Sequence, residues 1–139
     1  MEAAKHMIYV VDDDDAVRDS MRALLESCDF EVRDFSSARE FLAARAQSHG
    51  DCLVLDLHMP VTGGIELLAK MKAEGSRLPA IIMTGRSDAA IKQRAAQSGA
   101  FALFDKPVSE HALLDAIGRA IASGVPALTS QGEPPASKQ

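Results

Sequence analysis

Aromatic residues, cysteines and positive charge are all scarce in this chain of 139 residues. It contains no tryptophan, one tyrosine and two cysteines, and its 20 acidic residues outnumber its 15 basic ones. A net charge of -5, with lysines and arginines scattered along the chain, argues against nucleic acid or an anionic membrane as a direct partner. No apolar run approaches the roughly 18 residues of a membrane span, and the first residues lack a signal-peptide core. These absences favour a cytoplasmic protein.

The chain also lacks the signs of a disulfide framework and of a glycine-rich phosphate loop. Cys28 lies in a helical pattern and Cys52 begins an apolar run, so we expect two reduced thiols in the core. After the first apolar run come four aspartates, residues 12–15, which would repel a phosphate instead of cradling it. A flavin- or nucleotide-binding protein is therefore disfavoured.

Five short apolar runs recur along the chain at intervals of about 20 to 30 residues and are typical of strands. They lie at residues 7–11, 30–34, 52–56, 80–83 and 100–104. Segments with helical spacing of apolar residues separate them, and this alternation predicts a parallel sheet with helices on both faces. The run at 30–34 alternates polar and apolar residues, which suits a strand at the edge of that sheet.

Two segments are expected to be less firmly held than the rest. In the helical segment 87–97, Ile91 is the only large apolar residue. At roughly 25 cal/mol per Å² of buried apolar surface, such a helix costs little to move. Residues 124–139 are rich in proline and show no periodicity, which is typical of a flexible tail or the start of a linker. We therefore expect one folded domain over residues 1–123.

Polar residues follow four of the five predicted strands. Asp12 and Asp13 come after the first, Asp56 ends the third, Thr84 follows the fourth and Lys106 follows the fifth. Functional groups collect at the carboxyl ends of the strands in open parallel sheets, so we expect these side chains to meet. Three carboxylates in one cleft repel one another unless a cation lies between them, and oxygen ligands favour magnesium.

The hydroxyl and the ammonium indicate what the magnesium is for. Opposite the carboxylates, Thr84 and Lys106 would form a cradle for the oxygens of a phosphoryl group. Asp56 is then the natural acceptor, because a carboxylate is ionised at neutral pH and needs no general base. Each residue alone would be unremarkable, and an aspartate run after a strand often only caps a helix, as Asp14 or Asp15 could do here. Their joint placement at four strand ends favours phosphoryl transfer.

Four motifs carry a family resemblance, in the order "VVDDDDAVR", "LVLDLHMPVTGGIELL", "IIMTG" and "FDKP". Over about residues 6–123 the chain resembles the receiver domain of two-component response regulators. The resemblance implies a flavodoxin-like (βα)5 fold in three layers, with a parallel sheet of strand order 2-1-3-4-5. It implies that Asp56 is the phosphoacceptor and that Asp13 binds magnesium directly, with Asp12 acting mainly through water. The backbone carbonyl of His58 would be a further metal ligand.

The same resemblance assigns roles to the residues around the acceptor. Thr84 would be the switch hydroxyl and Lys106 would bind the phosphoryl group. The peptide bond between Lys106 and Pro107 would be cis. The side chains of His58 and Arg86 occupy positions that tune the lifetime of the acyl phosphate in the family.

The chain departs from the family pattern at Leu103, where an aromatic residue usually acts in the switch. Phe104 should point to the opposite face of its strand and cannot replace that residue. We therefore expect activation to rely on Thr84 and on movement of the helix at 87–97, biased by the charge of the new phosphate. Gly64 falls at the turn glycine of the family, where a positive φ would be tolerated.

The details of the motifs favour the FixJ-like branch of receivers, in which a DNA-binding domain often follows, whereas no such segment follows here. The sequence predicts a single-domain response regulator and not an enzyme, although the chemistry leaves room for self-dephosphorylation. Its donor would be a sensor histidine kinase or a histidine phosphotransfer protein. Phosphorylation would change the face built from the fourth helix, fifth strand and fifth helix. This face would then bind a downstream protein or a second copy of the chain.

Two alternatives stay open at this point. The chain could be the receiver fragment of a FixJ/NarL-like transcription regulator that lacks its DNA-binding domain, since a proline-rich tail is compatible with a linker. A haloacid-dehalogenase-like phosphatase also combines a nucleophilic Asp, a Thr, a Lys and magnesium on an α/β sheet. Those enzymes place a second carboxylate two residues after the nucleophile, and His58 in that position disfavours them for want of a proton donor.

Overall fold

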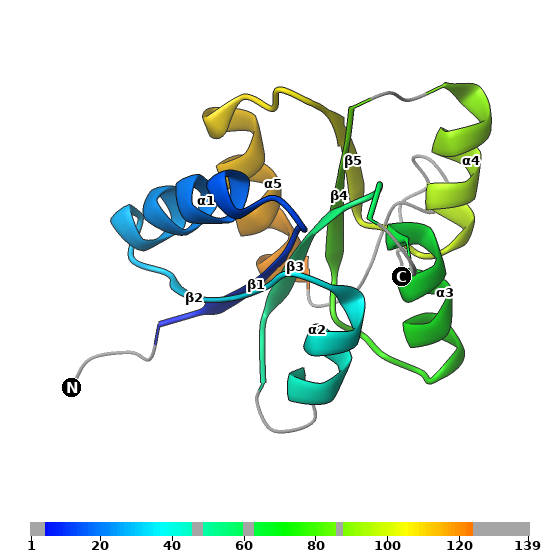
Figure 1. Ribbon diagram of the computed structural model, residues 1–139, viewed down its shortest axis with the longest axis horizontal. Coiled ribbons are helices and arrows are strands. Elements are labelled where there is room, and N and C mark those ends of the chain that lie inside the picture. Colours follow the sequence, from blue (N-terminus) through cyan, green and yellow to red (C-terminus); the bar gives the residue numbers. More distant parts are fainter. Residues whose placement is uncertain (1–4, 46–48, 60–62, 86–87, 124–139) are drawn as a thin grey trace.

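The computed structural model describes residues 5–45, 49–59, 63–85 and 88–123. These residues form a parallel sheet with helices on both faces (Figure 1). The strands are β1 (Met7–Val11), β2 (Glu31–Phe35), β3 (Cys52–Asp56), β4 (Ala80–Thr84) and β5 (Ala102–Asp105). They lie in the order β2-β1-β3-β4-β5, which confirms the predicted flavodoxin-like topology.

The composition of each strand matches its place in the sheet. β1, β3 and β4 are apolar and buried along nearly their whole length, because each has a neighbouring strand on both sides and helices on both faces. β2 alternates between exposed and buried positions and lies at one edge, as its sequence predicts. β5 forms the other edge and is mostly half-buried.

The helices cover the two faces of the sheet in groups of two and three. On one face lie α1 (Asp15–Ser27) and α5 (Glu110–Ser123), and on the other lie α2 (Ala38–Arg45), α3 (Gly64–Ala73) and α4 (Ala89–Gln97) (Figure 1). Alternate residues of β3 serve both cores, since Val54 packs with the first group and Leu55 with the second. Within the described residues, none of the helices is both long and apolar enough to cross a membrane.

The two ends of α1 bear on separate predictions. At its start, the side chain of Asp14 accepts hydrogen bonds from two backbone N–H groups of the first turn, at 2.9 and 3.1 Å. At its other end, Cys28 is the C-cap and is exposed, because the helix ends one residue earlier, at Ser27. Cys52 is in the core, where burial raises the pKa of its thiol to about 12. The prediction of core thiols is therefore right for Cys52 and wrong for Cys28.

The α4 helix is the least embedded of the five helices described here. It begins at Ala89, later than the predicted start at residue 87, because Asp88 caps it by accepting a hydrogen bond from the N–H of Ile91 at 2.9 Å. Ala95 is its one buried residue, and Ile91 is half-buried. These observations confirm the prediction of a weakly packed helix at this position.

Candidate functional site

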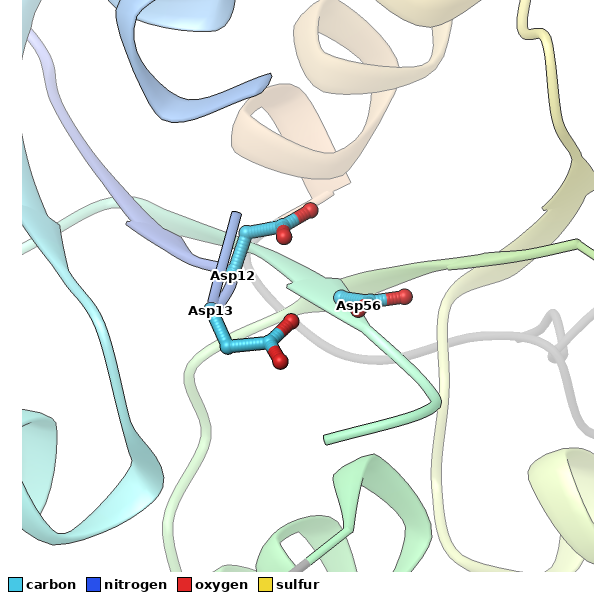
Figure 2. Close-up of side chains that lie close together, drawn as sticks. All are labelled: Asp12, Asp13 and Asp56. Atoms are coloured by element: carbon cyan, nitrogen blue, oxygen red, sulfur yellow. The ribbon is translucent and has the colours of Figure 1, made fainter. Parts of the chain in front are cut away.

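Three aspartates meet at the carboxyl edge of the sheet. Asp12 and Asp13 follow β1, and Asp56 is the last residue of the adjacent strand β3. Figure 2 shows the three side chains close together, and one carboxylate oxygen from each lies within 4.8 Å of the others. Asp12 and Asp56 are buried, whereas Asp13 is exposed. Two neighbouring strand ends thus concentrate negative charge at one point.

A single ammonium group faces two of these carboxylates. The Nζ atom of Lys106 lies 3.1 Å from Oδ1 of Asp56 and 3.8 Å from Oδ2 of Asp12. The lysine follows β5 and is held in place by its backbone N–H, which donates to the carbonyl oxygen of Thr84 at 2.7 Å. The peptide bond between Lys106 and Pro107 is cis. Among the described residues, the three carboxylates thus carry more charge than the one ammonium that faces them.

The carboxylate of Asp12 is only half satisfied. Its Oδ1 atom accepts a hydrogen bond from the backbone N–H of Asp14 at 2.9 Å, but its buried Oδ2 atom finds no hydrogen-bond partner among the described residues. Burial raises the pKa of the Asp12 carboxyl, and the neighbouring carboxylates of Asp56 and Asp13 raise it further against the opposing effects of the Asp14 N–H and Lys106. An unsatisfied oxygen among oxygen-only donors fits a hard divalent cation such as magnesium.

The hydroxyl of Thr84 lies at the end of β4 and is fully buried. Its Oγ1 atom is 2.9 Å from Nε2 of His58, a residue that follows Asp56 by two positions and is itself exposed. The backbone N–H of His58 also lies 3.4 Å from Oδ1 of Asp56. The contact between the imidazole and the hydroxyl was not predicted from the sequence. Arg86, the other residue expected to tune the acyl phosphate, lies outside the described residues.

Sequence reasoning also missed Arg18, which holds the acidic turn in place. Its Nη1 atom donates to the backbone oxygen of Asp12 at 2.8 Å, and its guanidinium pairs with Asp15 and Asp34. These contacts join the end of β1 to α1 and β2. The available signal in the sequence is weak, because an arginine one turn into a capped helix usually forms only a surface pair.

Gly64 shows that one prediction had the wrong physical reason. The residues with positive φ in the described part of the chain are Asp29, Gly75 and Gly99, and Gly64 instead starts α3 with helical backbone. A Cβ atom at Gly64 would lie 2.9 Å from the backbone oxygen of Asp56 and 3.0 Å from Cα of Leu57. Glycine is needed there because the helix approaches the backbone of the acceptor closely.

The two residues in the middle of β5 point to opposite faces of the sheet. Leu103 packs with the core shared by α2, α3 and α4, whereas Phe104 packs with the core shared by α1 and α5. This alternation confirms that Phe104 does not replace the aromatic residue usual in the family at position 103. On the Thr84 side of the sheet, β5 therefore contributes an aliphatic side chain.

The substitution Asp12→Asn is expected to stabilise the protein in EDTA at pH 7 by about 1–2 kcal/mol. A carboxyl with a raised pKa in the folded state contributes stability when protonated and loses it as the pH rises through that pKa, whereas an amide never ionises. Urea unfolding of the wild type and the variant measures the difference, which should shrink as the pH falls through the raised pKa and vanish below about 4, the pKa of an unfolded aspartate. The exposed Asp13→Asn is the control and should have a smaller effect. A less stable Asp12→Asn protein would contradict this description of the cluster.

Comparison with known proteins gives a consistent result. The family model of the response regulator receiver domain matches residues 8–118. The transcriptional regulatory protein FixJ of Bradyrhizobium diazoefficiens is 42% identical over 127 residues, which cover 91% of this chain and 62% of FixJ. The transcriptional regulatory protein TdiR of Thauera aromatica is 38% identical over 115 residues, which cover 83% of this chain and 51% of TdiR.

A solved structure shows the same relationship in three dimensions. Full-length FixJ from B. japonicum superposes with a TM-score of 0.81 at 42% sequence identity, over 90% of this chain and 62% of that chain. The chain thus spans between about half and three-fifths of the length of these relatives.

Proposed function

Because this chain belongs to the family of response regulator receiver domains, we propose that Asp56 is the carboxylate that takes the phosphoryl group in its phosphoacceptor signalling role. The observation that carries the proposal is the position of Asp56, buried at the end of β3 with Lys106 Nζ 3.1 Å from its Oδ1 atom. The phosphatase alternative is not favoured, since the residue two positions after Asp56 is a histidine whose ring contacts Thr84.

The reaction needs little from the protein beyond positioning and charge. A carboxylate oxygen of Asp56 forms a bond to phosphorus while the bond from phosphorus to the donor nitrogen breaks, and its electron pair leaves with the donor. The ammonium of Lys106 neutralises charge on the phosphoryl oxygens, and the Thr84 hydroxyl donates a hydrogen bond to one of them. The donor we propose is the phosphohistidine of a sensor kinase or of a histidine phosphotransfer protein.

A magnesium ion fits the acidic end of this site. The side chains of Asp12, Asp13 and Asp56, with the backbone carbonyl of His58, would hold it. The supporting observation is the buried Oδ2 atom of Asp12, for which the described part of the chain provides no hydrogen-bond partner. Bound magnesium would neutralise negative charge on the phosphoryl oxygens during transfer.

Phosphorylation of Asp56 would act on the rest of the domain through Thr84 and α4. Leu103 provides no aromatic ring for a switch. Of the described helices, α4 has the fewest buried residues, so the charge of a phosphoryl group would move it at low cost. The face of α4, β5 and α5 would then bind a downstream protein or a second copy of the chain. His58 and Arg86 would set the lifetime of the acyl phosphate. Among the described residues, the last helix ends at Ser123, and the flexible tail predicted for residues 124–139 lies outside them.

The proposed function is tested by incubation with phosphoramidate, followed by intact-mass measurement. With magnesium, the protein is expected to gain one phosphoryl group, and with EDTA it should gain none. Asp13→Ala should need more magnesium than the wild type to reach the same extent of modification, because it removes one of the proposed ligands. No adduct at any magnesium concentration would refute the proposed function.

A further inference from the structure

We infer that the imidazole of His58 holds the Thr84 hydroxyl away from the phosphoryl group and so opposes the switch. This inference rests on the proposed function of Asp56 and Thr84 and adds a positioning residue to that site. Its basis is the hydrogen bond of 2.9 Å between Nε2 of His58 and Oγ1 of Thr84. The inference includes the tautomer of His58 in which Nε2 accepts this hydrogen bond and the Thr84 hydroxyl donates it.

The hydroxyl cannot serve His58 and a phosphoryl group together. A threonine hydroxyl has one proton, and its side chain occupies one of a few staggered rotamers. When that proton is given to Nε2 of His58, it is not available to an oxygen bound to Asp56. The switch must therefore exchange one hydrogen bond for the other. Since Thr84 is fully buried, its hydroxyl has no access to bulk water that would compensate during the exchange.

The position of His58 lets this exchange reach α4. The side chain lines a cleft of about 190 Å³ together with Ile65 of α3 and with Ile91 and Arg94 of α4. When the ring is released from Thr84, it can repack among these residues. On this face β5 supplies the aliphatic side chain of Leu103, and the ring of His58, which contacts Thr84, belongs to the segment after β3.

Beryllofluoride with magnesium is the probe, because it binds an acceptor carboxylate as a phosphoryl mimic without covalent chemistry. Its apparent dissociation constant is measured from amide resonances of residues 89–97 by NMR. Without the hydrogen bond that favours the opposing rotamer, His58→Ala should bind the probe about two- to tenfold more tightly than the wild type. His58 is exposed, so this change should leave the fold intact.

Two further comparisons separate positioning from a general effect. In a Thr84→Val background the His58→Ala change should have no effect on affinity, because the group through which His58 acts is gone. His58→Gln keeps a polar group of similar reach and should restore wild-type affinity. His111→Ala, which removes an exposed histidine from α5, is the control and should bind as the wild type does.

The outcomes distinguish this inference from the function beneath it. A wild-type protein that does not bind beryllofluoride overturns the proposed function and this inference with it. A wild type that binds the probe, with His58→Ala binding equally or more weakly, overturns the inference alone. An equal gain from His58→Ala with and without Thr84 also overturns it, because His58 would then act independently of the hydroxyl.

Discussion

The Asp56→Asn protein is expected to form no phosphoryl adduct under conditions that modify the wild type fully, a loss of at least about a hundredfold in rate. The amide that replaces the carboxylate has a similar shape but cannot form an acyl phosphate. The fold should persist, because the substitution removes one of three clustered negative charges and leaves the packing around β3 unchanged.

Intact-mass measurement after incubation with magnesium and phosphoramidate reads out this loss. Asp115→Asn, which changes an exposed aspartate on α5, is the matched control and should be modified like the wild type. Modification of Asp56→Asn at the wild-type rate would place the acceptor elsewhere and refute the assignment.

The second large effect is expected from Lys106→Met, which should slow phosphorylation by about a hundredfold. The ammonium lies 3.1 Å from Asp56 and is the cation placed to neutralise a phosphoryl group there. Methionine retains most of the length of the side chain, so a slower rate of phosphorylation would result from the missing positive charge. The variant should also be less stable in EDTA, because Asp12 and Asp56 are left without their counterion.

The time course of adduct formation measures the rate, and urea unfolding measures the stability. Lys92→Met removes an exposed lysine from α4 and serves as the charge-matched control. A Lys106→Met protein phosphorylated as fast as the control would show that the lysine has no part in transfer. Lys106→Met removes the positive charge of the cluster and Asp12→Asn removes one of its negative charges, so the two variants should change stability in opposite directions.

Much of the fold follows from the periodicity of the sequence. The apolar run at 52–56 coincides with β3, and the alternating run at 30–34 is shifted by one residue from β2 but lies at the edge as predicted. The strand order came from the family resemblance, since apolar runs do not reveal which strands are neighbours. Boundaries were missed where a cap decides them, as at Asp88, whose side chain caps the start of α4.

The candidate site was predictable to the extent that strand ends determine it. In a parallel sheet, a residue at the end of a buried strand has little freedom, so Asp12, Asp56 and Thr84 could be placed from spacing alone. The contact between His58 and Thr84 could not, because it depends on the path of the chain after β3 and on the rotamer of an exposed side chain. The close approach of α3 that requires Gly64 likewise depends on packing in three dimensions.

The most direct test of the account is to identify the residue that carries the phosphoryl group. Borohydride reduces an acyl phosphate to an alcohol, so treatment of the phosphorylated wild type converts the modified aspartate to homoserine, which peptide sequencing by mass spectrometry locates. The account predicts homoserine at position 56 and unmodified aspartate at positions 12 and 13. Homoserine at position 12 or 13, or a phosphoryl group retained on a histidine, would contradict it.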